Sequence, residues 1–161
     1  RGFIAPSVVD ASGDLRSVPR VDPPPPPFTP TPLPTITPVP SGNLAGSPPS
    51  LTPATPVCNQ QFEVLVNITN NGTARTTGES TVVIQDVHVA SGSVQATITR
   101  TVPALDPGSN FVIGGPLTIS TFFNEEHRIV VTIDQGNVIA ETNENDNILT
   151  TTYTLAQGAC G

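Results

Sequence analysis

Apolar and polar residues alternate along most of the chain from residue 58 onward, a pattern that indicates β-strands rather than helices. In the first run the apolar residues occupy every second position, at Phe62, Val64, Val66 and Ile68. Successive side chains of a strand point to opposite faces of the sheet, so this run would bury one face and expose the other. Similar runs follow. The expected strands are residues 62–69, 81–90, 94–102, 111–120, 127–134 and 148–155.

These six strands favour an all-β fold, an immunoglobulin-like β-sandwich. They are short, rich in Val, Ile and Thr, and separated by turns such as Asn70-Asn71-Gly72 and Asp106-Pro107-Gly108. Nowhere do the apolar residues show helical spacing. Gly114-Gly115-Pro116 interrupts the fourth strand, which predicts a β-bulge on an edge strand. The expected core residues of the last two strands are Ile129, Val131, Ile133, Leu149, Tyr153 and Leu155.

Ahead of the strands, the stretch from Pro23 to Pro56 holds fourteen of the nineteen prolines and no charged residue. Proline fixes φ and lacks a backbone N–H, so neither a helix nor a sheet ladder is expected to continue through it. Polyproline II is the remaining conformation, and a rise of about 3.1 Å per residue would give a span of about 100 Å. The pattern therefore predicts three regions: an apolar N-terminal segment (1–22), a Pro/Thr-rich arm (23–57) and a folded domain (58–161).

The strand count predicts an incomplete sandwich. A sandwich of about seven strands needs one more before Phe62, and residues 51–57 contain Pro53 and Pro56, which makes them a poor central strand. An absent first strand would leave an open sheet edge, to which another chain can add a strand. The N-terminal segment is too short for a core of its own, so it is either a disordered tail or a docked donor strand. Its candidate subunit contacts are Phe3, Ile4, Val8 and Val9.

The distribution of charge argues against two classes of partner. The chain has a net charge of −7, with thirteen Asp and Glu against six Arg and no Lys. Residues 1–57 are neutral, so the part from residue 58 onward carries the whole excess. Nucleic acids and anionic membrane surfaces bind clustered Lys and Arg, so neither is an expected partner. No apolar run approaches the ~18 residues of a membrane span, and membrane insertion is not expected.

Two observations favour a secreted, extracellular or cell-surface protein. The sequence begins at Arg1 and contains no Met, as expected of an exported product already trimmed of its leader. The two cysteines, Cys58 and Cys160, flank the strand region, and a disulfide between them would close a loop of about 100 residues, worth about 4.7 kcal/mol in the chain-entropy description. Two unrelated buried thiols are the alternative. A disulfide would require an oxidising compartment.

Residues 131–147, VTIDQGNVIAETNENDN, form the most specific stretch of the chain. Together with VNITNNGTA at 66–74 and ALDPG at 104–108, they resemble the bacterial cell-adhesion-related domain family, CARDB, an immunoglobulin-like module. The resemblance covers about residues 60–157 and implies an extracellular binding or structural module. The residues that match the family's pattern in the first stretch are Asp134, Asn137, Val138, Glu141, Asn143, Glu144 and Asn147.

The acidic turn within this stretch allows two interpretations. Asp134, Glu141, Glu144 and Asp146, interspersed with Asn residues, supply hard oxygen ligands that could hold Ca²⁺. The spacing lacks the D-x-D-x-D-G order of a known calcium loop, and Asp and Asn side chains also stabilise turns by bonding nearby backbone groups. Turn stabilisation is the favoured interpretation, and no metal is predicted.

No catalytic residue and no cofactor are predicted, and an enzyme is not expected. His88 and His127 are the only imidazoles, and neither belongs to a nucleophile or metal motif. His127 follows Glu125-Glu126, which is expected to form the solvated beginning of a strand rather than a proton relay. The chain also lacks G-x-S-x-G, H-E-x-x-H, C-x-x-C and a phosphate-binding glycine loop.

Glycosylation has two kinds of candidate site. Threonines among prolines have the composition that accepts O-linked sugars. Asn67 and Asn71 match the N-x-S/T acceptor pattern. An unmodified Thr-rich spacer is the alternative. The candidate threonines are Thr29, Thr31, Thr35, Thr37, Thr52 and Thr55.

The favoured function is a structural subunit of an extracellular filament or surface fibre. Polymerisation would follow when the arm of one copy docks on the next, because head-to-tail contacts of this kind do not close on themselves. The main expected partner is therefore a second copy of the chain. The alternative is a cell-surface adhesion or carbohydrate-binding module on a proline-rich stalk, with glycans as partners, although six Phe, one Tyr and no Trp offer few rings for stacking on sugars. A released fragment of a larger surface protein is a third reading.

Overall fold

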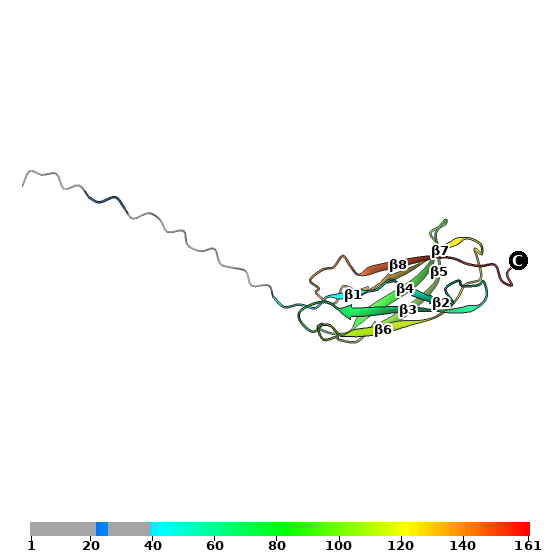
Figure 1. Ribbon diagram of the computed structural model, residues 1–161, viewed down its shortest axis with the longest axis horizontal. Coiled ribbons are helices and arrows are strands. Elements are labelled where there is room, and N and C mark those ends of the chain that lie inside the picture. The colour runs from blue at the N-terminus through cyan, green and yellow to red at the C-terminus, as the bar shows by residue number, and fades with distance from the viewer. Residues whose placement is uncertain (1–21, 26–38) are drawn as a thin grey trace, which may run out of the picture. The chain divides into compact units, whose positions relative to one another are not determined.

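The computed structural model describes residues 22–25 and 39–161 (Figure 1). Thr37–Gly161 forms one compact unit, whose described part contains eight strands and no helix. Nothing in residues 22–25 and 39–161 therefore forms a helix able to cross a membrane. Residues 22–25 are exposed and have no regular secondary structure. Several candidate residues lie outside the described residues: Phe3, Ile4, Val8, Val9, Thr29, Thr31, Thr35 and Thr37.

All six predicted strands are present, which confirms the all-β fold class. The strand β5 has the predicted bounds, and the others differ from prediction by no more than about two residues at either end, the usual uncertainty of strand and helix boundaries. Their bounds are β3 (Gln61–Asn70), β4 (Ser80–His88), β5 (Val94–Val102), β6 (Asn110–Thr118), β7 (Glu126–Thr132) and β8 (Ile148–Thr154). Two further strands precede them, β1 (Leu44–Gly46) and β2 (Ser50–Thr52).

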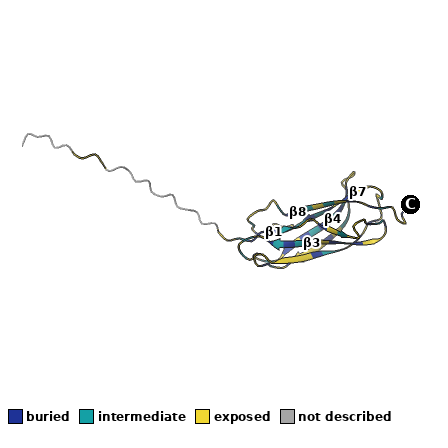
Figure 2. Cartoon of the chain, viewed as in Figure 1, coloured by how far each residue is buried: buried dark blue, intermediate teal, exposed yellow. Residues whose placement is uncertain are grey.

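The strands form two antiparallel sheets packed as a sandwich (Figure 1). One sheet has the order β5-β4-β7-β8. In the other, β3 is central, with β6 on one side and both β1 and β2 on the other. Buried residues alternate with half-buried or exposed ones along β3 (Figure 2). The buried ones include Phe62, Val64, Val66 and Ile68, which pack between the sheets. The expected core residues on β7 and β8 also pack there, Leu149 at its margin.

The prediction of an absent first strand is wrong. β1 and β2 together form one edge strand that pairs antiparallel along β3, from Asn70 to Glu63. Gly46 lies opposite Ile68 and Ser50 opposite Leu65, so the three residues 47–49 face only two residues of β3. This extra residue makes a β-bulge, and Pro48 and Pro49 lie within it. A bulged edge strand tolerates the missing N–H groups of proline, which is why a proline-rich stretch can supply a strand here.

Residues 41–58, which we call the seam segment, also bridge to residues on either side of β8, a strand of the other sheet. Gly42 forms an isolated parallel bridge with Glu141, and Val57 forms one with Ala156. Near the second bridge the Cys58 N–H donates to the Ala156 carbonyl at 2.8 Å, and the Ala156 N–H donates to the Pro56 carbonyl at 2.9 Å. The seam segment therefore pairs with β3 at its centre and, at its two ends, bridges to residues that precede and follow β8. The folded domain begins well before residue 58, the expected boundary.

The predicted bulge at Gly114-Gly115 is also absent, although β6 is an edge strand as expected. The register between β3 and β6 runs without a shift from Gln61 to Thr69. Gly114 is required for a different reason: its φ is +153°, and a Cβ atom at this position would overlap the carbonyl oxygen of Val64. Gly114 therefore permits close approach of two backbones, and Gly115 leaves room for the Arg100 side chain, without an inserted residue.

The expected disulfide between Cys58 and Cys160 is confirmed, with 5.9 Å between the two Cα atoms. Both cysteines are buried, and Cys58 is the last residue of the seam segment. The disulfide therefore ties the end of the seam segment to the C-terminal residues that follow β8.

Replacing both cysteines with serine should lower the free energy of unfolding by about 4 kcal/mol, because the unfolded chain regains the entropy of a loop of about 100 residues. Urea denaturation followed by circular dichroism measures this loss. Reductant added to the wild-type protein is the matched control and should reproduce the loss, while leaving the double variant unchanged. A loss below about 1 kcal/mol, outside the usual range for such bonds, would contradict this account.

Candidate functional site

The first polar cluster lies where the chain enters the sandwich and centres on Asn43, which is buried. The Asn43 backbone N–H donates to Asn70 Oδ1 at 3.0 Å. Its side-chain amide donates to Asp146 Oδ2 at 3.0 Å, and its Oδ1 accepts from the backbone N–H of Asn143 at 2.7 Å. One asparagine thus joins the seam segment to the turn after β3 and to the loop between β7 and β8. We call this group, with Glu141 and Asn147, the Asn43 clamp.

Glu141 completes the clamp. One of its carboxylate oxygens accepts the backbone N–H of Leu44, and the other accepts Nδ2 of Asn147 at 2.8 Å. Burial raises the pKa of Glu141; these two hydrogen bonds oppose that shift, and the nearby charges of Glu144 and Asp134 add to it. The carboxylate therefore replaces a strand partner for Leu44, whose side chain is fully buried.

The other three acidic candidates also accept hydrogen bonds from the chain. Asp134 Oδ2 accepts the N–H of Ile139 at 2.8 Å, Glu144 Oε1 accepts the N–H of Glu141 at 2.8 Å, and Asp146 bonds Asn43 as described. Within residues 22–25 and 39–161, no three or more His, Cys, Asp and Glu side chains are placed together to hold a metal ion. The acidic side chains of this loop instead accept hydrogen bonds from backbone N–H groups and from the Asn43 side chain.

Asn70 is a member of the clamp that sequence reasoning missed. It is fully buried, and its side chain makes four hydrogen bonds. Its Oδ1 accepts the N–H groups of Asn43 and Gly72, and its Nδ2 donates to the carbonyls of Ala74 and Leu105 at 2.9 and 2.8 Å. The Asn70-Asn71-Gly72 turn signal pointed to this position, but not to the segments that it joins.

The second polar cluster lies at the opposite end of the strands and contains both histidines. His127 is completely buried, whereas Glu125 and Glu126, expected at the solvated beginning of this strand, are exposed. Its Nδ1 lies 2.7 Å from Asp86 Oδ1, and its Nε2 lies 3.1 Å from the carbonyl of Phe122. A carbonyl can only accept, so Nε2 carries a proton. The Tyr153 hydroxyl donates to the second oxygen of Asp86 at 2.5 Å.

His88 lies directly opposite His127 in the pairing of β4 with β7. Its Nε2 is 2.8 Å from Glu125 Oε2, its Nδ1 is 2.7 Å from the Ser91 hydroxyl, and its ring stacks on Phe122 with 3.9 Å between centroids. Every ring nitrogen of the two histidines thus has a protein partner. Neither ring is placed to take a proton from an external substrate, and the cluster satisfies buried polar groups in the core.

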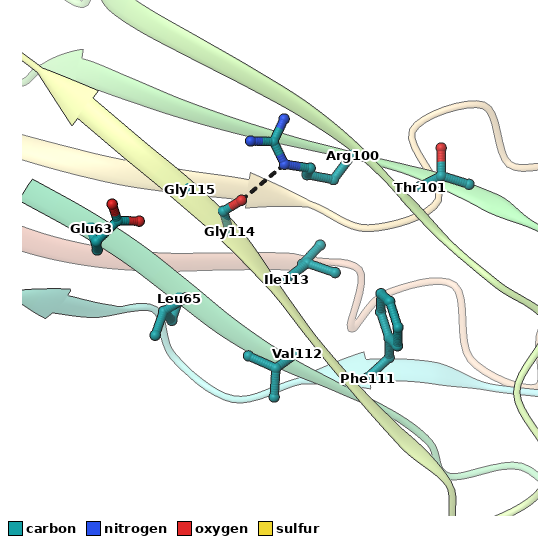
Figure 3. Close-up of a pocket in the computed structure, with 9 residues that line it drawn as sticks. All are labelled: Glu63, Leu65, Arg100, Thr101, Phe111, Val112, Ile113, Gly114 and Gly115. Carbon is teal, nitrogen blue, oxygen red and sulfur yellow. Dashed lines mark hydrogen bonds between the residues drawn. The ribbon is translucent and has the colours of Figure 1, made fainter.

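The third feature is a surface depression that we call the outer groove (Figure 3). It has a volume of about 410 Å³ and is lined by Glu63, Leu65, Arg100, Thr101 and residues 111–115. In Figure 3 the Val112 side chain lies on the opposite side of β6 from those of Phe111 and Ile113. Arg100 reaches from β5 to donate through Nε to the Gly114 carbonyl at 2.9 Å, which fixes the two sheets together at this side. The sequence carried no signal for the groove beyond the two glycines.

The CARDB family profile matches residues 48–151. The chain belongs to the CARDB family. The CARDB match spans both sheets and most of the Asn43 clamp, and it includes the residues whose pattern suggested the family. In this chain, residues of the family pattern such as Glu141 and Asn143 contact the seam segment.

Solved CARDB structures share the fold. A crystal structure of a CARDB domain from Pyrococcus furiosus, in complex with di-metal ions, has a TM-score of 0.57 and 21% identity, covering 75% of this chain and 99% of that one. The same domain in solution has a TM-score of 0.52 and 20% identity, covering 73% and 95%. A domain of a presumed cell surface protein from Methanosarcina acetivorans has a TM-score of 0.52 and 25% identity, covering 71% and 92%. No curated protein matches the chain significantly.

The candidate glycosylation sites differ in exposure. Thr52 and Thr55 are exposed at the end of the seam segment. Asn71 is exposed in the turn after β3, whereas Asn67 is half-buried within β3 and its Oδ1 is buried. Of the two asparagines, the structure leaves Asn71 the more accessible to a modifying enzyme.

Glu141→Ala should cost about 1–3 kcal/mol of unfolding free energy, because the buried Leu44 N–H loses its acceptor. Glu141→Gln keeps an acceptor, and the Asn147 amide can turn so that its unpartnered Oδ1 accepts from the new amide. The raised pKa of Glu141 means that its contribution to stability is complete below about pH 4.5 and is lost as the pH rises through the folded-state pKa. Urea titrations from that pH to neutrality should therefore show that the unfolding free energy of Glu141→Gln rises relative to that of the wild type as the pH increases. If the difference in unfolding free energy between Glu141→Gln and the wild type does not change with pH, the pKa of this carboxylate is not raised by burial.

Tyr153→Phe should lower the unfolding free energy by about 1.5–3 kcal/mol, because buried Asp86 loses a donor while the ring still packs on Phe62. Burial, followed by the hydrogen bond and the charge of Asp86, raises the pKa of Tyr153, so the hydroxyl stays protonated and the loss should hold across neutral pH. Thermal denaturation tests this. The matched control is Thr152→Val, an exposed position on the same strand, which should change stability by less than about 0.5 kcal/mol. Equal losses of stability from the two substitutions would contradict the predicted contribution of the Tyr153–Asp86 hydrogen bond.

Proposed function

We propose that this chain is a non-catalytic structural subunit of an extracellular surface or fibre, which joins a neighbouring copy through residues 1–22. Membership of the CARDB family, an immunoglobulin-like family without catalytic activity, supports a binding or structural role. The related domain from Methanosarcina acetivorans belongs to a presumed cell surface protein, and the disulfide requires an oxidising compartment. The acidic domain fits exposure to water rather than contact with nucleic acid.

The contact between copies does not complete a sandwich, because each domain already has its first strand. β1 and β2 occupy the edge of β3 at which a donor strand would have paired. The proposed contact instead buries apolar side chains of the N-terminal segment on a neighbour's surface. Four side chains such as Phe3, Ile4, Val8 and Val9 would contribute on the order of 6–12 kcal/mol before the costs of ordering and association.

One observation carries the proposal. The seam segment supplies the first strand from residues 44–52, so the domain has no need of residues 1–22 for its own closure. An apolar cluster of Phe and aliphatic residues, joined to a closed domain by an uncharged proline-rich stretch, is then a contact for another molecule. Residues 23–40, which precede the seam segment, would span about 56 Å in the polyproline II conformation, longer than a ten-residue strand of about 34 Å.

Deleting residues 1–22 should convert assemblies of the full chain into monomers with an unchanged domain. Sedimentation velocity over a range of concentrations measures the assembly, and circular dichroism checks the fold. The matched control replaces residues 10–22 with a Gly/Ser stretch of equal length and keeps residues 1–9, so assembly should persist. Assemblies that survive the deletion would exclude this function, as would a full chain that stays monomeric at every concentration.

A further inference from the structure

We infer that the buried contact between His127 and Asp86 holds a shared proton that the unfolded chain lacks at neutral pH, and that the domain therefore takes up a proton when it folds. Both side chains are fully buried, on the neighbouring strands β7 and β4. The inference concerns the second polar cluster and is independent of the proposed function. It describes a domain that is stable in mild acid and loses stability as the solution becomes alkaline.

The hydrogen-bond partners fix the number of protons on this pair. Nε2 of His127 faces the Phe122 carbonyl at 3.1 Å and therefore carries a proton, because a carbonyl has none to donate. Nδ1 of the same ring lies 2.7 Å from Asp86 Oδ1. A hydrogen bond at this distance needs one further proton, placed either on Nδ1 or on the carboxyl group. The pair thus holds two protons, either as a His127 cation beside a carboxylate or with both groups neutral.

The Tyr153 hydroxyl does not supply the shared proton. It donates to Asp86 Oδ2 at 2.5 Å, and burial, followed by the hydrogen bond and the charge of Asp86, raises the pKa of Tyr153. The hydroxyl therefore keeps its own proton and leaves the other carboxyl oxygen to His127. The shared proton also keeps net charge out of the core, because an ionised Asp86 beside a neutral ring would be a buried anion without a counter-charge.

The second histidine does not replace that proton. The His88 ring, from β4, lies 5.6 Å from the His127 ring between centroids, and its nitrogens face Glu125 and the Ser91 hydroxyl instead. Both nitrogens are satisfied when this ring is neutral, because Nε2–H donates to Glu125 and Nδ1 accepts from Ser91.

The remaining neighbours of the pair bring no charge into the core. Glu126 and Arg128, which flank His127 along β7, are exposed to water, where salt screens their charges. Phe62 of β3 packs on the Tyr153 ring, and Ala96 of β5 lies opposite Asp86 in the pairing of β4 with β5. The proton count of the cluster is therefore decided by His127 and Asp86.

Proton numbers in the folded and unfolded chains set the dependence of stability on pH. An unfolded histidine loses its second proton near pH 6.5, where an unfolded aspartate is already ionised. Above that pH the unfolded pair holds one proton and the folded pair two, and stability falls with rising pH wherever the folded state binds more protons. Each pH unit then changes the folding equilibrium constant tenfold for as long as the folded pair keeps its shared proton. Between about pH 4 and 6.5 both states hold two protons, and the pair contributes no pH dependence.

Asp86→Asn tests the proton number with little change of shape. Nδ2–H of the new amide can donate to Nδ1 of a neutral His127, and its Oδ1 can accept from Tyr153, which preserves both hydrogen bonds without the shared proton. Between pH 6.5 and 8.5, urea denaturation should show the wild type losing at least tenfold in folding equilibrium constant relative to Asp86→Asn, about 1.4 kcal/mol. The matched control is Asp106→Asn, the same substitution at an aspartate whose side chain is 63% exposed, and its pH profile should follow that of the wild type. Parallel profiles for the wild type and Asp86→Asn would overturn the inference.

A measurement on the unsubstituted chain covers the case in which Asp86→Asn does not fold. Nitrogen-15 NMR of the histidine rings at pH 7.5, with the carbon-13 shift of the Asp86 carboxyl group, reports the protons directly. A His127 cation beside an ionised Asp86, or an Nε2–H ring beside a protonated Asp86, would support the shared proton. A neutral His127 ring beside an ionised Asp86, in either tautomer, would exclude it.

Discussion

Pairing of residues 41–58 with β3, together with their bridges to the residues on either side of β8, is the constraint on which the rest of this domain depends. A β-sandwich has open sides where its two sheets meet, and unpaired backbone groups there must bond to water, to a side chain or to another chain. In this domain a single bulged strand pairs with β3 at its centre and bridges the β8 side at Gly42 and Val57. On the opposite side Arg100 joins β5 to β6 through the Gly114 carbonyl. Both sides of the sandwich are thereby closed within one chain.

The family pattern in residues 134–147 acquires a physical meaning from this constraint. Its carboxylates accept N–H groups of the seam segment and of their own loop, and its Asn143 N–H donates to the Asn43 side chain, where the regular ladder has ended. Side chains do this work because the seam segment crosses between sheets and cannot keep a continuous ladder with either one. Asn70 serves the same purpose from β3, with all four of its side-chain bonds made to backbone groups. A buried polar side chain that meets several backbone groups costs little and fixes several segments at once.

The two ends of the sandwich are thus held by different chemistry. Amide and carboxylate side chains hold the end at which the chain enters, whereas the other end has a buried Asp86, His127 and Tyr153 group and the disulfide. Most polar side-chain atoms of both clusters bond within the domain; Asp146 Oδ1 and Asn147 Oδ1 are buried without a partner. Contact with other molecules therefore falls to the outer faces, where the outer groove exposes apolar side chains on a rigid floor. This distribution suits a module whose role is to connect rather than to catalyse.

Local patterns in the sequence determined the six strands from β3 to β8, because a two-residue period with buried Val and Ile admits only a half-buried strand. They also determined the acidic turn and the location of both cysteines at the margins of the core. The sequence did not predict the first strand, because Pro48 and Pro49 argue against a strand unless a bulge on an edge accommodates them. The sequence also did not reveal the partners of Asn43, Glu141 and His127, because these contacts join residues 27 to 97 positions apart and follow only once the sheets are packed. The tertiary structure alone decided that the sandwich is complete, because only the pairing of distant backbones shows which edge a strand covers.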